Sequence, residues 1–328
     1  MNRRALGRTG LQVAPLGFGC GNVGGLLVRG EYPTMRRAVA RAVELGLNYF
    51  DTAPLYGNGQ SEVNLGAVLR ELRPDVVVGT KVRLAAHDLD RIGPAIVESA
   101  EASLRRLGRA SVDLLQLHNP ITLQHRSKSV SLTPDDMTVV FGAFETLQRQ
   151  GKIRFWGITA LGDTEALHQV VSAGGFHTLQ AVYNLLNPSA GQRMPADFPY
   201  QDYDRLIDRA AANRIGVIGI RALAGGALSG TMDRHPVAVR GVTPLATGRD
   251  YAEDVARARA LDDLVADGSV GSLVEAAIRF AIGKLEISTV MVGTSSVEQL
   301  DQAAAAAGRG PLPAQVRERV SSAVHRPR

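Results

Sequence analysis

The sequence repeats one local pattern eight times: a short apolar or β-branched run, a turn, and a helix-like amphipathic stretch. Runs such as VVVG and VDLLQL are largely apolar, which is typical of strands buried on both faces. Parallel strands need helical crossovers, and eight such units can close a barrel. The expected strands are Pro15–Gly19, Asn48–Asp51, Val76–Lys81, Val112–His118, Ile153–Thr159, Leu179–Asn184, Gly216–Ile220 and Thr289–Gly293.

The stretches between these runs predict the helices of a single α/β domain over residues 1–328, a (β/α)8 TIM barrel. A doubly wound open sheet is the alternative, because GCGNVG after the first strand has the spacing G-x-G-x-x-G. A glycine-rich turn alone is a weak signal, and the eight repeated units favour the barrel. The segment 311–328 is expected to form one more helix lying over a barrel mouth. The other helices are expected at about 34–45, 61–71, 91–107, 134–150, from 163, 203–214, 252–267, 272–282 and 297–307.

Composition narrows the class of protein. Hydrophobic residues make up 45% and charged residues 21% of the chain, so a large core is expected rather than disorder. Cys20 is the only cysteine, which excludes an intramolecular disulfide, and no stretch has the about 18 apolar residues of a membrane span. We therefore expect a cytoplasmic protein without a membrane partner.

The net charge of +5 does not indicate a nucleic-acid partner, because the arginines are spread along the chain and many stand beside acids. Lysine is rare, with only four, including Lys81, among the 37 basic residues. Because arginine is the usual cation of this chain, a lysine at the end of a strand is less easily explained as an ordinary surface charge. Nothing in the sequence indicates an oligomeric state.

Three consecutive expected strands carry polar groups to the end of the barrel where such folds do their chemistry. Asp51 ends one strand with Tyr56 five residues later, Lys81 ends the next, and His118 ends the third. Three of them have a structural explanation when taken alone: Asp51 could start a turn, Tyr56 could be a packing residue, and His118 could be a hydrogen-bonded group at a strand end. Lys81 is the hardest to explain so, because a buried ammonium needs a carboxylate partner, and Asp51 is the nearest candidate.

These four groups share one chemical purpose. Reducing a carbonyl requires a hydride on carbon and a proton on oxygen, and a phenol with a pKa of about 10 is a weak acid at neutral pH. A nearby ammonium is expected to lower the pKa of Tyr56, a carboxylate can hold the ammonium, and the imidazole of His118 can orient the substrate oxygen. No metal is expected, since the chain has no H-x-x-x-H or H-E-x-x-H pair.

Three segments carry a resemblance to a known family: LGLNYFDTAPLYGNGQSE, VVVGTK and LGRASVDLLQLHNP. Together they resemble the signature regions of the aldo-keto reductases, and the likeness extends from LGRTGLQVAPLGFG to VGTSSVEQL, nearly the whole chain. It implies a catalytic tetrad of Asp51, Tyr56, Lys81 and His118, with Tyr56 as the general acid. It also implies a small-molecule carbonyl or alcohol as substrate.

The resemblance further implies NADP(H), or less often NAD(H), bound across the barrel mouth. Gln180 and Thr159 match residues that contact the nicotinamide amide, and RALAGGALSG resembles the pyrophosphate segment. GTSSVEQL leads into a helix whose N-terminal end favours a phosphate. Ser295 and Gln299 match the family residues that bind the 2′-phosphate of the cofactor. The implied cofactor-binding residues are Gly21, Thr159, Gln180, Arg221, Leu223, Gly225, Leu228, Gly293, Thr294, Ser295 and Gln299.

Three positions depart from the family pattern. Thr159–Ala160 replaces the usual Ser-Asn, and Ile220 stands where many members have an aromatic residue. Arg221 follows it and can pair with a cofactor phosphate or with an acidic substrate. Ser295 replaces a basic residue, which weakens selectivity for NADP(H) without removing our preference for it.

Two other functions stay open on the sequence. Lys81 could instead form a Schiff base in an aldolase, or the barrel could keep its nicotinamide as a redox sensor that regulates a partner. Substrate choice is expected to depend on the irregular segments 119–135, 185–202 and 231–251. Their mix of polar and aromatic residues permits either kind of substrate: Arg126, Lys128, Arg193, Phe198, Tyr200 and Tyr251.

Overall fold

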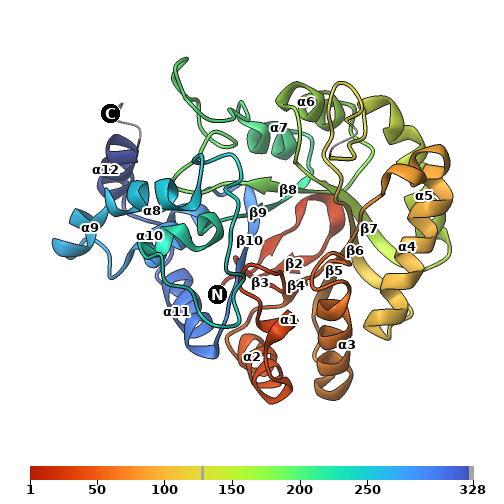
Figure 1. Cartoon of the computed structure of the whole chain (residues 1–328), viewed down its shortest axis with the longest axis horizontal. Coiled ribbons are helices and arrows are strands. Elements are labelled where there is room, and N and C mark those ends of the chain that lie inside the picture. Colours follow the sequence, from red (N-terminus) through yellow and green to blue (C-terminus); the bar gives the residue numbers. More distant parts are fainter. Residues whose placement is uncertain (127–128, 325–328) are drawn as a thin grey trace.

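The computed structural model describes residues 1–126 and 129–324, and within them eight parallel strands close into a barrel (Figure 1). Lys128, one of the candidate substrate-contact residues, lies outside the described residues. The strand order is β10-β3-β4-β5-β6-β7-β8-β9, so strands that follow one another in sequence are neighbours in space. This confirms the predicted (β/α)8 fold. The strands are β3 (Leu16–Gly19), β4 (Tyr49–Asp51), β5 (Val77–Val82), β6 (Val112–Leu117), β7 (Ile153–Thr159), β8 (Thr178–Val182), β9 (Gly216–Ile220) and β10 (Ile287–Gly293).

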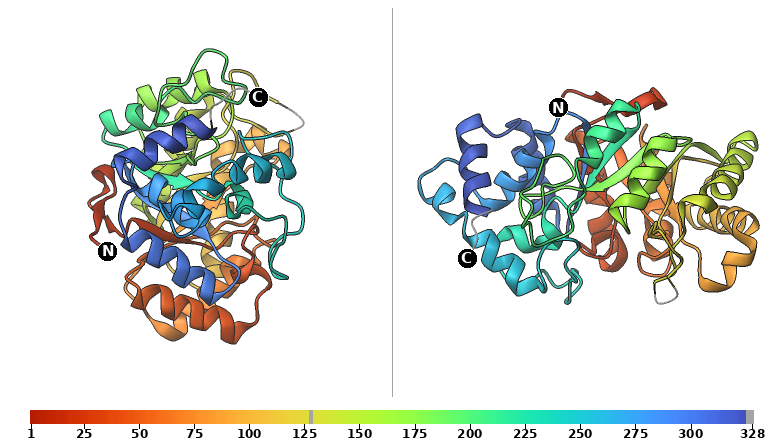
Figure 2. Two further views of the ribbon diagram at one scale, coloured as in Figure 1. Left: turned by 90° about the vertical axis from the view of Figure 1, so that its left-hand side faces the viewer. Right: turned by 90° about the horizontal axis from the view of Figure 1, so that it is seen from above.

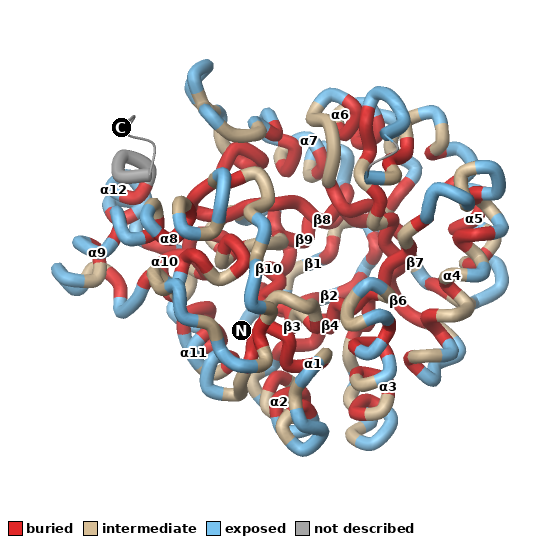
Figure 3. Tube along the Cα trace, viewed as in Figure 1, coloured by how far each residue is buried: buried red, intermediate tan, exposed pale blue. Residues whose placement is uncertain are grey.

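The crossover helices form a ring around the barrel and bury one face each, as Figure 3 shows by the red inward-facing segments. In α2, the buried Met35, Ala38, Val39 and Ala42 recur at helical spacing toward the strands. The helices are α1 (Leu26–Arg29), α2 (Tyr32–Glu44), α3 (Gln60–Leu72), α4 (Ile92–Leu107), α5 (Met137–Arg149), α6 (Thr164–Ala173), α7 (Leu206–Ala212), α8 (Tyr251–Arg259), α9 (Asp262–Ala266), α10 (Leu273–Ile282), α11 (Val297–Gly308) and α12 (Ala314–Val324).

A short N-terminal hairpin, not foreseen from the sequence, covers one end of the barrel. It consists of β1 (Arg4–Ala5) and β2 (Gln12–Val13), joined through the 3-10 turn Gly7–Thr9. Its apolar residues pack into the barrel interior. Gly7 has a φ of +52°, and a Cβ there would lie 2.2 Å from the backbone nitrogen of Gly216, so no larger residue fits. Figure 2 shows the hairpin (red) and the segment after β9 (teal) at opposite ends of the barrel.

Two helices are shorter than their sequence patterns predicted. The pattern at 203–214 yields only α7, because Asp204 and Arg205 adopt positive φ values that no helix accommodates. The pattern at 252–267 breaks into α8 and α9. In both cases the apolar spacing is helical, but local backbone conformation ends the helix early.

The C-terminal helix α12 lies on the outside of the helical ring, beside α9 and α10 (Figure 1). Arg319 bonds Asp267 and Ser269 near the end of α9, and Val316 is buried in the main core. None of the described residues of this segment lines the pocket at the barrel mouth, and residues 325–328 lie outside the described part of the chain. The expectation that 311–328 covers a mouth is therefore not met by α12.

No helix in the described residues has the length and apolar character needed to cross a membrane.

Candidate active site

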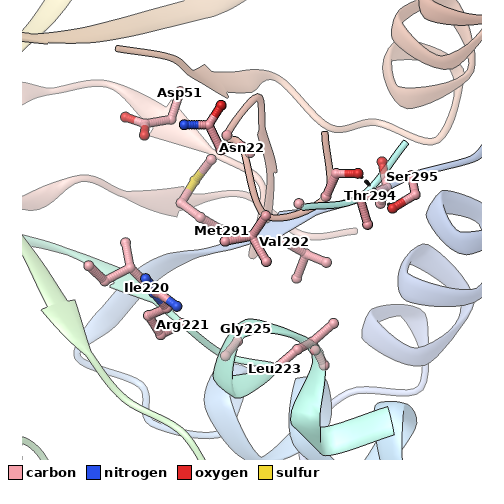
Figure 4. A pocket seen from close by; sticks show the side chains of 18 of the residues that line it. Asn22, Asp51, Ile220, Arg221, Leu223, Gly225, Met291, Val292, Thr294 and Ser295 are labelled. Carbon is pink, nitrogen blue, oxygen red and sulfur yellow. Dashed lines mark hydrogen bonds between the residues drawn. The ribbon is translucent and has the colours of Figure 1, made fainter. Parts of the chain in front are cut away.

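A pocket of about 640 Å³ opens at the carboxyl ends of the strands, opposite the N-terminal hairpin. Figure 4 shows its elongated shape: Asp51 and Arg221 lie toward one end, and Thr294 and Ser295 toward the other. The strand ends β3, β4, β7, β8, β9 and β10 all contribute to its wall. The pocket therefore runs from the strand ends around Asp51 to the start of α11 (Val297–Gly308).

Lys81 and Asp51 form a buried ion pair beneath this pocket. The ammonium of Lys81 bonds the Asp51 carboxylate and donates to the backbone carbonyl of Thr52 at 2.8 Å, and its side chain is only 1% exposed. Burial alone would lower the pKa of Lys81, but Asp51 and Tyr56 together outweigh it and hold the pKa above its ordinary value. Lys81 therefore stays charged.

Tyr56 stands directly above this pair, in the loop between β4 and α3, and lines the pocket. The Lys81 ammonium is 4.9 Å from the centre of the Tyr56 ring. Burial raises the pKa of the phenol above its ordinary value, and the positive charge of Lys81 only partly offsets this. Lys81 lowers this pKa as expected, but desolvation of the phenolate, which was not foreseen, outweighs the ammonium.

His118, directly after β6, faces Tyr56 across the pocket. The two rings meet edge to face with centroids 6.2 Å apart. Burial and the nearby cations Lys81 and Arg83 lower the pKa of His118 to about 3, so the imidazole is neutral at physiological pH. Its Nδ1 atom is buried and has no hydrogen-bond partner among the described residues. The ring can therefore act as a neutral hydrogen-bonding group but not as a cation.

Gln180 and Thr159 lie beside Asp51 and line the pocket. The side-chain nitrogen of Gln180 donates to Asp51 Oδ1 at 2.9 Å, and the Thr159 hydroxyl donates to the Gln180 oxygen at 3.2 Å. Tyr49 donates to the same Asp51 oxygen at 2.9 Å from inside the barrel. Both carboxylate oxygens of Asp51 are thus engaged, which fixes the orientation of the Lys81 pair.

The turn after β9 forms the lower wall in Figure 4. Ile220, Arg221, Leu223 and Gly225 all line the pocket, and Gly225 has a φ of +71°. Leu228 does not: its side chain is fully buried in the core, and its N–H donates to the carbonyl of Leu223. The backbone kinks at Gly225 and Gly226, and Leu228 lies beyond this kink.

The other end of the pocket is built where β10 meets α11. Gly293, Thr294, Ser295 and Gln299 line it. Gly21, from the loop after β3, also lines the pocket but lies beside Tyr56, where a Cβ would be 3.5 Å from the phenol ring. Ser295 donates its hydroxyl to the carbonyl of Gly24 at 2.6 Å and its N–H to the Gln299 side-chain oxygen at 2.8 Å. The buried hydroxyl of Thr294 has no partner within the described residues, which leaves it available to a ligand.

Across residues 1–126 and 129–324, no three His, Cys, Asp or Glu side chains lie close enough together to hold a metal ion.

Comparison with known proteins decides the family. The profile of the Aldo/keto reductase family matches residues 15–325. The chain belongs to this family. It is 29% identical to L-galactose dehydrogenase of Arabidopsis thaliana over 308 residues, which cover 92% of this chain and 87% of that protein. A probable voltage-gated potassium channel subunit beta of Arabidopsis thaliana is 26% identical over 323 residues, 92% and 90% of the two chains.

Solved structures agree with this assignment. The holo form of an aldo-keto reductase from Bacillus halodurans matches with a TM-score of 0.73 and 25% identity, over 98% of this chain and 96% of that one. Family membership supports an oxidoreductase acting on a small molecule.

Several pocket residues of this aldo-keto reductase were not foreseen from its sequence. Arg83, which directly follows β5, lines the pocket. Asn22 accepts a hydrogen bond from the N–H of Gly57 at 2.9 Å, which fixes the loop that carries Tyr56. The positions of Arg83 and Asn22 both depend on backbone conformation outside the strands, which the sequence pattern does not show.

Proposed function

We propose that this protein reduces an aldehyde or ketone to an alcohol, or runs the reverse reaction, with a nicotinamide cofactor as hydride carrier and Tyr56 as the general acid. The observation that carries the proposal is the stack of Asp51, Lys81 and Tyr56, which places a fixed ammonium under a phenol that faces the pocket. A phenolate formed beside that ammonium is stabilised by its charge. With its raised pKa the phenol keeps its proton at neutral pH and can give it to the more basic alkoxide oxygen that hydride transfer creates.

Several residues of the chain take part in the proton transfer. The Tyr56 hydroxyl donates a proton to the carbonyl oxygen as that oxygen gains negative charge. Neutral His118 stands opposite Tyr56 and offers a hydrogen bond that orients the same oxygen. Asp51 and Tyr49 keep the Lys81 ammonium in position while the charge on Tyr56 changes. Apolar Leu55 and Leu161 line the surrounding wall and limit water.

The pocket fits an extended dinucleotide. Gly225 and Gly226 line the pocket without side chains and adopt positive φ, so a ligand can approach the backbone there. Gly24 lies so close to the chain after β10 that a Cβ would lie 2.6 Å from the carbonyl oxygen of Thr294. Arg221 adds a cation and Thr294 an unused hydroxyl. When bound, the nicotinamide supplies or accepts the hydride. Gln180 and Thr159 would hold its amide end.

We further propose that NADP(H) is preferred over NAD(H). The helix α11 begins beside Ser295 and Gln299, and the N-terminal end of a helix favours an anion such as a 2′-phosphate. A site built for the unphosphorylated ribose usually offers a carboxylate to its hydroxyls. Among the described residues of β10 and α11, none that lines the pocket is acidic. We also place the enzyme in the cytoplasm. Its single cysteine, Cys20, is buried and forms no disulfide.

A Schiff-base aldolase is less well supported. Lys81 does not line the pocket, is almost fully buried and is engaged by Asp51 and Thr52. A nucleophilic lysine needs a free amine that reaches the substrate. A regulatory redox sensor is the better second candidate, because the chain resembles a probable channel subunit beta over 92% of its length.

The test is a panel of aldehydes, ketones and sugars assayed by the loss of NADPH or NADH absorbance. Multiple turnovers with at least one carbonyl class support the reductase. A single turnover followed by very slow cofactor release would favour the sensor. Trapping of a carbonyl substrate on Lys81 by borohydride would favour the aldolase and overturn the proposal.

A further inference from the structure

Arg83 is a pocket cation with no acidic partner. It follows β5 directly, lines the pocket and is partly buried. Its one hydrogen bond goes to the backbone carbonyl of His118 at 3.2 Å, and no carboxylate in the described residues lies within ion-pair distance of it. Burial lowers the pKa of its guanidinium, as expected for a cation that has lost water without gaining an anion. A guanidinium has five N–H donors, so most of those on Arg83 are unused.

The other charges of the pocket do not balance Arg83. Lys81 and Asp51 neutralise each other. Arg234 donates to three backbone carbonyls and the Tyr251 hydroxyl, so its donors are engaged. The only other acidic residue of the described pocket lining, Asp233, is exposed on the segment after β9. The Tyr56 end of the pocket therefore carries the excess positive charge of Arg83 and Arg221.

Arg221 and Arg83 approach the pocket from different strands. Arg221 begins the glycine turn after β9, where the cofactor phosphates would be held. Arg83 belongs to the β5 end and is tied to His118, which together with Tyr56 would hold the carbonyl oxygen. An anion on the cofactor can thus satisfy Arg221, while Arg83 is left for the substrate.

We propose that Arg83 binds an anionic group, a carboxylate or a phosphate, on the carbonyl substrate. The inference rests on the proposed reductase function and names the substrate class of the same site. The planar guanidinium matches both oxyanions, and a charge-assisted pair formed in a partly buried site is worth more than one at the surface. The bond from Arg83 to His118 places the anionic group close to the reacting carbonyl, so a compact substrate is expected.

The experiment compares matched substrates in steady-state assays of the enzyme with NADPH. One pair is glyoxylate against its neutral amide, glyoxylamide, and the other is glycolaldehyde phosphate against glycolaldehyde. For the wild type we expect kcat/KM to favour the anionic member of at least one pair by about ten- to hundred-fold, mainly through KM. The pair that shows the preference identifies the bound anionic group as a carboxylate or as a phosphate.

Arg83→Gln should reduce that ratio to within about threefold of unity, and Arg83→Lys should keep part of it, since lysine retains the charge without the planar fork. The matched control is Arg109→Gln, because Arg109 is exposed and also bonds one backbone carbonyl, that of Ser111 at 3.2 Å. The control should leave the ratio unchanged. If Arg83→Gln fails to fold, the loss of the wild-type preference with rising salt serves as the second measurement.

The outcomes separate the two proposals. Equal reduction of charged and neutral members of both pairs by the wild type would overturn the role of Arg83 and leave the reductase intact. A preference that survives Arg83→Gln would overturn it as well. A failure to oxidise NADPH or NADH with any carbonyl would instead overturn the proposed function.

Discussion

Lys81 and Asp51, on the adjacent strands β5 and β4, form an ion pair whose side chains are only 1% and 7% exposed. Such a pair offers little net stability, but removing one partner leaves a buried charge unpaired. Because the Lys81 ammonium also lies 4.9 Å from the Tyr56 ring centre, the pair couples the stability of the barrel to the proposed chemistry.

Lys81→Met is expected to lower the free energy of unfolding by about 3–5 kcal/mol, because Asp51 would keep a buried charge without its partner. The double variant Lys81→Met/Asp51→Asn should recover part of that loss, since the uncompensated charge is gone. Urea denaturation measures both. Carbonyl reduction should stay depressed at least about a hundredfold in each variant. Recovery of activity together with stability would contradict a chemical role for Lys81.

Acid should destabilise the protein through His118. Its pKa falls from 6.5 to about 3 on folding, so the unfolded chain binds the proton more readily than the folded one. The resulting stability is fully present above about pH 6.5 and is lost as the pH falls toward 3, at about 1.4 kcal/mol per pKa unit. His118→Asn should flatten the dependence of unfolding free energy on pH between 7 and 4. The exposed His87, 82% accessible, gives the matched control His87→Asn.

The same shift predicts the pH profile of catalysis. Since His118 is neutral above about pH 4, kcat/KM for reduction should have no inflection near pH 6.5. An inflection there that disappears in His118→Asn would mean that the imidazole is protonated during the reaction, and it would rule out a neutral His118 as the group that orients the carbonyl oxygen.

Gln299→Glu tests where the 2′-phosphate is held. Gln299 accepts the N–H of Ser295 through its side-chain oxygen, and glutamate can keep this bond while adding a negative charge. We expect NADPH affinity to fall at least about tenfold through charge repulsion and NADH affinity to change little. Fluorescence titration with both cofactors measures this, with NADH as the internal control. Equal losses for the two cofactors would place the phosphate elsewhere.

The barrel could be predicted from the sequence because periodicity is a local property. The apolar runs around Val78 and Leu115 and the helical spacing in α2 each indicate their element without knowledge of the rest of the chain. The N-terminal hairpin could not be predicted, because its two-residue strands are too short to show a period and depend on a close contact between Gly7 and Gly216.

The candidate site likewise has features that could be predicted from the sequence and features that could not. Strand ends place Asp51, Lys81 and His118 at one mouth, so their convergence follows from topology. The net pKa of Tyr56 depends on how much water the folded barrel removes, which the sequence does not encode locally. The inward turn of Leu228 and the pocket position of Arg83 likewise depend on backbone conformation beyond the strand ends.

The central claim is that the Tyr56 hydroxyl delivers the proton. Tyr56→Phe keeps the ring that packs against His118 and Lys81 and removes only the acid. The most direct measurement is the single-turnover rate of carbonyl reduction by NADPH-loaded Tyr56→Phe, beside cofactor affinity measured by fluorescence titration. We predict a rate at least about a hundredfold below wild type with NADPH affinity nearly unchanged. A variant that reduces carbonyls at the wild-type rate would contradict the role of Tyr56 as the general acid.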